Sequence, residues 1–291
     1  MRHLFTRLLS PSLLLAALFS LNLQAASVWQ VSKDGRHFYL AGTVHLLSKQ
    51  DYPLPDSYDK AFAASDRLVF ETDLAELTSA AGMTKLIQQN TLPAQSTLKQ
   101  HLSAEVYQQL AEHARSRQIP ISAIESFKPA FASMMLATVE LQRLGAAEAG
   151  VDMHYLQLAQ LQAKPISGLE TLDEHLAVMT ALNEVDADTL IMSALKDMKN
   201  IETMLEQMKT AWRVGDISAL EQLFQADLKA FPDMYQVLLV KRNHAWMPHL
   251  QQLLAQDDVS MVLVGALHMA GDDGLLTLLK QAGFSLKQLN D

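Results

Sequence analysis

The chain has no cysteine in its 291 residues, which excludes disulfide bonds and cysteine nucleophiles. Only 19% of the residues are charged, and no run of lysine or arginine follows the pattern expected for contact with a phosphate backbone. The formal net charge is −9. We therefore expect no nucleic-acid partner.

Several catalytic motifs are also missing. There is no Gly-x-Ser-x-Gly nucleophile turn, no Gly-rich phosphate loop and no His-Glu-x-x-His. His244 and His249 are five residues apart, which does not place them on one face of a helix. Four further histidines stand in polar helical contexts and are predicted to be surface residues: His101, His113, His154 and His175.

The first residues predict an export signal. Residues 1–7 carry two arginines and no acid, residues 8–23 are mostly apolar, and Gln24, Ala25 and Ala26 are suited to cleavage after Ala25. The apolar stretch is short for a membrane-spanning helix, although an uncleaved anchor is the alternative. We predict a signal peptide over residues 1–25, a periplasmic or secreted protein, and no stable membrane insertion after cleavage.

Strand patterns occur at both ends of the chain, and helical patterns fill its middle. Residues 27–31 and 37–41 are β-rich and flank an Asp-Gly turn, so they predict a hairpin. Further strands are predicted at 67–71, 164–167, 261–264 and 285–289, and helices at 57–64, 103–117, 129–144, 151–161, 186–212, 217–228 and 243–256, after Thr171 and from Gly274. We expect residues 26–291 to form a single α/β domain whose sheet is closed by the two ends of the chain.

One motif occurs twice, near each end of the predicted domain. Residues 38–45 have the sequence FYLAGTVH and residues 261–268 the sequence MVLVGALH, so in each case an apolar strand runs into Gly-x-x-His. Glycine permits a turn or a close backbone approach, and the histidine then stands at the carboxyl end of the strand, where ligands bind in open α/β sheets. We expect His45 and His268 to share one site. Glu71 ends another predicted strand and would join them if the strands are parallel.

These three residues suit a catalytic metal ion, because imidazole and carboxylate are common ligands of divalent ions. His45, Glu71 and His268 would form a two-histidine, one-glutamate set. Such an ion would lower the pKa of a water molecule and polarise a carbonyl. The structural alternative is that both histidines only end strands and hydrogen-bond to the backbone, with Glu71 an exposed acid.

Four other polar residues are candidates for the same site. Glu170 precedes a capping box, so it would either stabilise a helix N-terminus or act as a general base or as a partner that orients a ligand histidine. Arg242 and Asn243 precede a predicted helix, where Asn243 would be the N-cap or the pair would hold a substrate carbonyl or an oxyanion. Asp152 is interpreted as an acid at a helix start.

These motifs stand together in an order that resembles the TraB/GumN family, to which the Tiki metalloproteases belong. The resemblance is carried by GTVH at 42–45, FETD at 70–73, GVD at 150–152, GLET at 168–171, RN at 242–243 and GALH at 265–268. It covers nearly all of the chain after the signal. It implies an α/β fold like that of the erythromycin esterase and ChaN group, with a central mixed sheet built from two related halves around a large helical middle. It also implies a metal-dependent peptidase that uses the two Gly-x-x-His histidines and a strand-end glutamate.

From the residues and the resemblance together, we expect a metal-dependent hydrolase that acts on a peptide or protein substrate. Its ion would be zinc, manganese or cobalt, held by His45, Glu71 and His268. The catalytic residues would then be Glu170, Arg242 and Asn243. The alternative is a non-catalytic periplasmic binding protein that holds haem or a peptide ligand in the same cleft. Hydrolysis requires an open metal position beside a base, whereas a binding protein needs only a shaped pocket.

Overall fold

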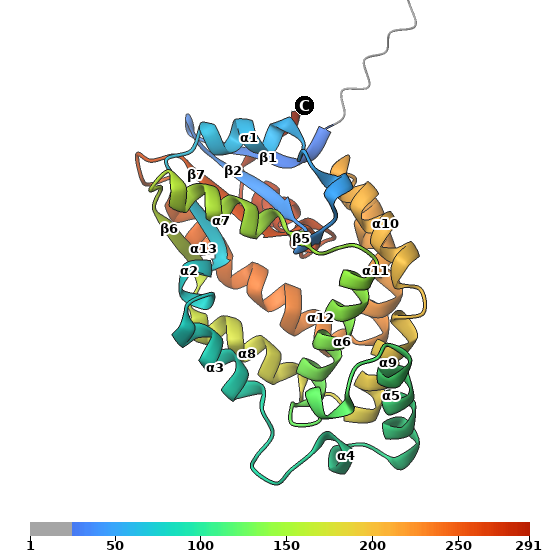
Figure 1. Cartoon of the computed structure of the whole chain (residues 1–291). Coiled ribbons are helices and arrows are strands. Elements are labelled where there is room, and N and C mark those ends of the chain that lie inside the picture. Colours follow the sequence, from blue (N-terminus) through green and yellow to red (C-terminus); the bar gives the residue numbers. More distant parts are fainter. Residues whose placement is uncertain (1–24) are drawn as a thin grey trace, which may run out of the picture.

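The computed structural model describes residues 25–291, apart from the side chains of residues 25 and 226–228. The signal peptide predicted for residues 1–25 lies outside this part of the chain, except for Ala25, at which strand β1 begins. A six-stranded mixed sheet and many helices make the fold α/β (Figure 1). Among the described residues, none of the helices is long and apolar enough to cross a membrane.

The central sheet has the strand order β6–β4–β7–β2–β1–β8. Its strands are β1 (Ala25–Lys33), β2 (Arg36–Thr43), β4 (Arg67–Thr72), β6 (Ile166–Glu170), β7 (Ser260–Gly265) and β8 (Ser285–Asn290). The hairpin predicted near the start is confirmed by the antiparallel pairing of β1 with β2. Strands β6, β4, β7 and β2 pair in parallel, so their carboxyl ends meet at one edge. The two Gly-x-x-His strands are direct neighbours, with Thr43 opposite Gly265.

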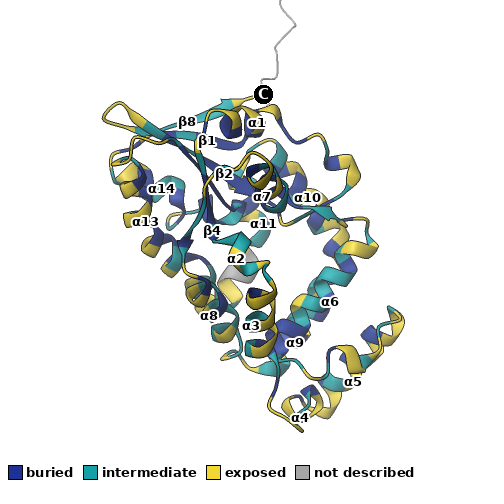
Figure 2. Ribbon diagram, turned by 60° about the vertical axis from the view of Figure 1, so that its left-hand side comes forward, coloured by how far each residue is buried: buried dark blue, intermediate teal, exposed yellow. Residues whose placement is uncertain are grey.

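Alternate residues of the buried strands face two apolar cores, one on each side of the sheet. In β7, Met261 and Leu263 belong to the first core, and Val262 and Val264 to the second. The first core is completed by helices α1 (Asp56–Ala63), α7 (Val151–Leu161) and α10 (Ile201–Arg213), and the second by α13 (Lys241–Leu253) and α14 (Leu275–Gln281). Figure 2 shows the buried strands between these helices. Because both faces are covered, the edge of the sheet is left for a ligand.

The helical middle lies beyond the carboxyl edge of the parallel strands (Figure 1). It contains α2 (Leu74–Leu77), α3 (Ala80–Asn90), α4 (Leu98–His101), α5 (Ala104–Ser116), α6 (Pro129–Arg143), α8 (Leu172–Leu182), α9 (Ala187–Asp197), α11 (Ile217–Ala230) and α12 (Pro232–Tyr235). A third core joins α5, α6 and α9. Two predicted helix starts are confirmed, because Ser103 caps α5 by accepting from the Val106 amide and Pro129 opens α6.

The single helix predicted over residues 186–212 is wrong, because the chain forms two helices there. Helix α9 ends at Asp197 and α10 begins at Ile201. Ile191 in α9 packs into the third core, whereas Trp212 in α10 packs into the first core beneath the sheet. Ile201 at the start of α10 still belongs to the third core, so the chain turns at residues 198–200 and α10 then runs from the third core to the first. The apolar periodicity continues through the turn and therefore gives no sign of it.

A buried carboxylate ties the end of α5 to α6. The Glu140 side chain is only 1% exposed and accepts hydrogen bonds from Arg117 and, at 3.1 Å, from Arg143 Nε. His113, predicted to be a surface residue, is only 16% exposed and its Nε2 lies 3.5 Å from Glu140. Burial acts to raise the pKa of Glu140, but the two guanidinium groups lower it more, so the pKa lies below its usual value.

We expect Glu140→Gln to lower the free energy of unfolding by about 1–3 kcal/mol near pH 7. The pKa of Glu140 is lower in the folded chain than in the unfolded chain. Its stabilisation is therefore complete above the unfolded pKa of about 4.3 and is lost as the pH falls below that value. Urea denaturation of both proteins from neutral pH to about pH 3 measures the difference, which should shrink as the pH falls. A difference that stays constant over this range would contradict the prediction.

Candidate functional site

The candidate site lies at the carboxyl edge of the parallel strands. Glu71 is the second-to-last residue of β4, and Glu170 is the last residue of β6. His45 follows the end of β2, and His268 lies in the 3-10 helix η5 (Ala266–Met269) directly after β7. The parallel arrangement on which the sequence argument depended is confirmed. Side chains from four strands thus reach one edge.

The His45 ring is oriented by the N-terminus of α7. Its Nδ1 lies 2.9 Å from Asp152 Oδ2, and the Val151 amide donates to the Val44 carbonyl at 3.0 Å. Only glycine fits before this helix, because a Cβ at Gly150 would overlap the His45 carbonyl. Asp152 starts the helix, as predicted, and it also fixes the ring. Its charge raises the pKa of His45 above the usual value.

The His268 ring is buried and is oriented by Asn243. Its Nδ1 lies 2.6 Å from Asn243 Oδ1, and Asn243 Nδ2 donates to the His268 carbonyl at 3.1 Å. Burial lowers the pKa of His268 to about 4, so the ring is neutral at neutral pH. For both histidines the partner of Nδ1 is a side chain, which contradicts the structural alternative of backbone hydrogen bonds alone.

The prediction that Asn243 caps a helix is wrong. Helix α13 begins at Lys241 and continues directly from the π-helical turn η4 (Gln236–Val240), so Asn243 lies inside the helix. Its amide instead joins His268 to the Asp273 carbonyl, to which Nδ2 donates at 2.8 Å. The helix therefore supplies a side chain that holds the loop after β7.

The three predicted metal ligands converge above Gly265. The point at which a Cβ of this residue would stand is 3.3 Å from Glu71 Oε1, 3.7 Å from His268 Cδ2 and 4.0 Å from His45 Nε2. Glu71 Oε1 accepts from the Gly265 amide at 2.8 Å and lies 3.7 Å from His268 Nε2. Histidines from the two ends of the chain thus face one small volume, which the missing side chain leaves open.

Arg242 lies between the two glutamates. Its Nη2 is 2.6 Å from Glu71 Oε2 and 2.7 Å from Glu170 Oε1, and its Nε is 3.0 Å from Glu170 Oε2. Its Nη1 is 3.1 Å from His268 Nε2. Burial alone would lower the pKa of Arg242, but Glu71 and Glu170 raise it more. The guanidinium therefore carries its charge beside both carboxylates.

The two glutamates are held as carboxylates. Burial acts to raise the pKa of Glu71, but the Arg242 guanidinium and the hydrogen bond from the Gly265 amide lower it, so the pKa lies well below its usual value. Burial likewise opposes ionisation of Glu170, whereas hydrogen bonds from His175 and Arg242 lower its pKa. Both side chains are thus negatively charged at neutral pH.

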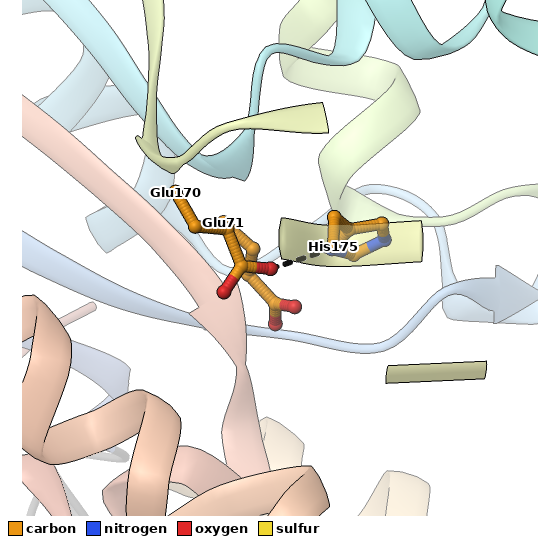
Figure 3. A group of neighbouring side chains, drawn as sticks. All are labelled: Glu71, Glu170 and His175. Carbon is orange, nitrogen blue, oxygen red and sulfur yellow. Dashed lines mark hydrogen bonds and ion pairs between the residues drawn. The ribbon is translucent and has the colours of Figure 1, made fainter. Parts of the chain in front are cut away.

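The predicted ligand set His45, Glu71 and His268 is not among the groups of described residues whose ligand atoms all lie within 4.8 Å of one another. Another group is, and it contains a residue that the sequence analysis placed on the surface. Glu71, Glu170 and His175 offer ligand atoms within 4.8 Å of one another (Figure 3). His175 lies in α8, its Nδ1 is 2.7 Å from Glu170 Oε1, and its side chain is 28% exposed. The surface prediction for His175 is therefore wrong. Of the four histidines given that prediction, His101 is exposed and the others are half-buried.

The oxygens of Glu170 are fully engaged. Oε1 accepts from His175 and Arg242, and Oε2 accepts from Arg242 and from Trp246 Nε1 at 3.0 Å. The Trp246 ring also lies 4.6 Å from the Arg242 guanidinium and 4.5 Å from the His268 ring. Sequence reasoning missed Trp246, although its position one helical turn after Arg242 was a usable signal. In this arrangement Glu170 holds Arg242 and His175 in place.

Comparison with known proteins agrees with this site. A family model described as the TraB/PrgY/gumN family matches residues 27–288. The chain belongs to the TraB/PrgY/gumN family. The match includes every candidate residue from His45 to His268, and the family predicted from the motifs is confirmed. No solved structure gives a significant match.

Relatives in the TraB/PrgY/gumN family include two proteins that carry the name uncharacterized protein YbaP. The chain is 29% identical over 251 residues to YbaP of Escherichia coli strain K12, which covers 84% of this chain and 88% of the relative. It has the same identity and coverage with YbaP of Shigella flexneri. These relatives support the family assignment and name no activity.

Two pockets of this TraB/PrgY/gumN protein open beside His45. One has a volume of about 260 Å³ and also includes Gly265 in its wall. The other has a volume of about 240 Å³ and includes Glu71, Asp152 and His175. Two larger pockets, of about 540 and 590 Å³, are lined by residues of α8, α12 and α10–α11 and contain none of the site residues. A ligand that contacts the site residues would therefore lie in one of the two smaller pockets.

Proposed function

We propose that this TraB/PrgY/gumN protein is a metal-dependent hydrolase of peptide bonds. The observation that carries the proposal is the matched orientation of the two histidines. Each Nδ1 faces a side-chain oxygen, of Asp152 or of Asn243, and the opposite ring edge is directed to the space above Gly265. Metal-binding histidines commonly use one ring nitrogen for such an outer partner and the other for the ion.

The donor types of His45, Glu71 and His268 suit a divalent ion, and binding would draw these side chains closer together than they stand in the structure. His45 would offer Nε2, and Glu71 would offer Oε1, because its Oε2 is engaged by Arg242. His268 would offer Nε2 once Arg242 Nη1, which lies 3.1 Å from it, gives way to the ion. Bound zinc, manganese or cobalt would supply a Lewis acid that polarises a carbonyl and lowers the pKa of water. Because Asp152 raises the pKa of His45, the ion would have to displace a proton from this ring, and affinity should rise with pH.

The remaining polar residues would serve the substrate and the ligands. Arg242 would stabilise the negative charge that develops on the carbonyl oxygen, since its guanidinium borders the space shared by Glu71 and His268. Glu170 would act as a positioning residue for Arg242 rather than as the general base, because both of its oxygens already accept two hydrogen bonds. Asn243 would position His268.

One observation favours the second candidate, a non-catalytic binding protein. Arg242 already pairs with both glutamates and donates to His268 Nε2, so these polar groups have partners without an ion. The volumes of the two pockets beside His45, about 260 and 240 Å³, limit the size of the ligand that such a protein would bind. Each is smaller than the roughly 300–1,000 Å³ of sites that take a whole drug-sized ligand. Their size favours a peptide over haem.

We also propose that the two strand–Gly-x-x-His units mark two related halves of an erythromycin esterase and ChaN-like fold. Their strands β2 and β7 are adjacent and parallel, and each is followed by a histidine at the same edge. Residues 26–291 would then be one domain. Export to the periplasm or secretion is part of the proposal and rests on the signal predicted for residues 1–25.

The test is metal binding paired with cleavage. Purified protein is titrated with Zn²⁺, Mn²⁺ and Co²⁺ by calorimetry, and a peptide library is digested with and without EDTA. We expect one ion per chain, and cleavage that EDTA removes and the ion restores. Protein that binds peptides but no ion would support the binding alternative. Failure to cleave any peptide with any of the three ions would contradict the hydrolase proposal.

A sharper form of this test uses Asp152→Asn, which keeps an oxygen beside His45 and removes its charge. We expect metal affinity, measured above the His45 pKa of about 9 so that no proton competes with the ion, to fall by about 10–100-fold, the usual effect of losing an outer partner of a ligand histidine. The control is Asp173→Asn, because Asp173 is also a first-turn helix acid but is 71% exposed on α8. This control should bind the ion like the wild type. Unchanged affinity in Asp152→Asn would count against His45 as a ligand.

A further inference from the structure

The 260 Å³ pocket beside His45 has an apolar wall that metal binding does not explain. Five half-buried apolar side chains surround it, and each comes from a different segment of the chain. They are Leu46 after β2, Leu141 in α6, Met208 in α10, Phe224 in α11 and Leu267 in η5. Because they belong to five segments, their meeting here is a product of the fold rather than of one amphipathic helix.

The pocket is continuous with the candidate site. His45 and Gly265 belong to its wall. Glu71 Oε1 and His45 Nε2 both lie near the Cβ position of Gly265, so the pocket borders the candidate site. Leu267 precedes His268 directly in the chain. A side chain seated among the five apolar residues would therefore leave its own backbone beside the proposed metal ligands.

The size of the pocket fits one side chain. A cavity of about 150 Å³ lined by apolar residues is enough to hold a benzene ring. The pocket of about 260 Å³ therefore accommodates leucine, methionine or phenylalanine. Covering half-exposed apolar surface with an apolar group is favourable, whereas a serine or a charged side chain would lose hydration without finding partners on such a wall.

We propose that this pocket receives an apolar side chain of the peptide substrate, next to the bond that is cleaved. This inference deepens the proposed hydrolase function and rests on it. The second pocket, of about 240 Å³, shares His45 with the first and includes Phe70, Leu74 and Met153. A bound peptide would extend from the first pocket, past His45, into this second pocket. The protein would thus select peptides that carry leucine, methionine or phenylalanine beside the reacting carbonyl.

The first experiment measures binding without turnover. The probes are the capped pentapeptides acetyl-Gly-Gly-Xaa-Gly-Gly-amide with Leu, Met, Phe or Ser as Xaa, titrated into the full protein in EDTA and followed by NMR. We expect the three apolar peptides to bind at least about 10-fold more tightly than the serine peptide. Equal affinity for all four peptides would overturn the pocket proposal, whether or not the protein proves to be a hydrolase.

A matched pair of variants locates the preference. Phe224→Ser removes part of the apolar wall and should abolish the preference. Leu223→Ser changes the neighbouring half-buried residue of α11, which lines a different pocket, and should keep it. If Phe224→Ser lowers the melting temperature, Phe224→Trp serves instead, because the larger ring should exclude the phenylalanine peptide before the leucine peptide. A preference that neither Phe224 variant alters would overturn the assignment to this pocket.

Digestion of the peptide library with added metal ion separates the two proposals. Cleavage with an apolar residue at a constant position beside the cut supports both. Cleavage with no such preference overturns the pocket proposal alone. Selective binding of apolar peptides without any cleavage overturns the hydrolase proposal and leaves the pocket as a binding site.

Discussion

Replacement of any one of His45, Glu71 and His268 by alanine should reduce metal-dependent peptide cleavage by about 10³-fold or more. Each substitution removes one of the three groups that converge above Gly265. The double variant His45→Ala/His268→Ala should be no less active than either single variant, because groups that act as one unit lose their effect together. Initial rates on one cleaved peptide, with bound metal measured for each variant, provide the comparison.

The control for these variants is a histidine outside the candidate ligand set whose hydrogen bond goes to the backbone. His249 is exposed, and its Nδ1 lies 2.6 Å from the Leu169 carbonyl oxygen. His249→Ala should keep both the ion and the activity. The His45 side chain is 72% exposed, so His45→Ala should lose the ion with little change in melting temperature. Wild-type cleavage rates in His45→Ala would contradict its assignment as a ligand.

Replacement of Arg242 by methionine should lower the free energy of unfolding by about 3–5 kcal/mol, the usual cost of leaving a buried charge without its partner. The side chains of Glu71 and Glu170 are 13% and 7% exposed, and both pair with the same guanidinium. Its loss would leave two carboxylates facing each other. Urea denaturation in EDTA measures the effect without a bound ion that could replace the missing charge.

A surface arginine provides the control for this measurement. Arg36 is 50% exposed and pairs with Asp257, which is 96% exposed, at 3.1 Å. Arg36→Met should cost less than about 1 kcal/mol. The double variant Arg242→Met/Glu170→Gln should recover part of the lost stability, because one of the two unpaired charges is removed. A cost below about 1 kcal/mol for Arg242→Met would show that the carboxylates do not depend on this pair.

The sequence predicts the strands of the site well but the partners of its side chains poorly. The apolar run before each Gly-x-x-His is a local signal, and it correctly places His45 and His268 at one edge of the sheet. The hydrogen bond between His45 and Asp152 joins residues 107 positions apart, and that between His268 and Asn243 joins residues 25 positions apart. Which partner each histidine takes depends on how α7 and α13 pack, and periodicity does not encode that packing.

The error over His175 has the same origin. Polar neighbours in α8 suggested a surface residue, and Thr171 and Glu174 do form the predicted capping box at the start of this helix. Only Thr171 separates β6 from α8, so the first turn of the helix stays beside the strand end and His175 contacts Glu170. The capping signal marks where the helix begins, but it does not give the direction in which the helix leaves the sheet.

The central position of β7 has a consequence for the order in which the molecule assembles. This strand lies between β4 and β2, yet it is followed by only one other strand of the sheet in the chain. The hydrogen-bonded residues Glu71 and Gly265 are 194 positions apart, and contacts between such distant segments form slowly because a long loop must close first. A growing chain that has not reached Ser260 leaves facing edges of β2 and β4 unpaired and lacks His268 altogether. The proposed peptide-cleaving centre therefore cannot exist in an unfinished chain, and synthesis order alone keeps a nascent molecule from acting on its neighbours or on itself.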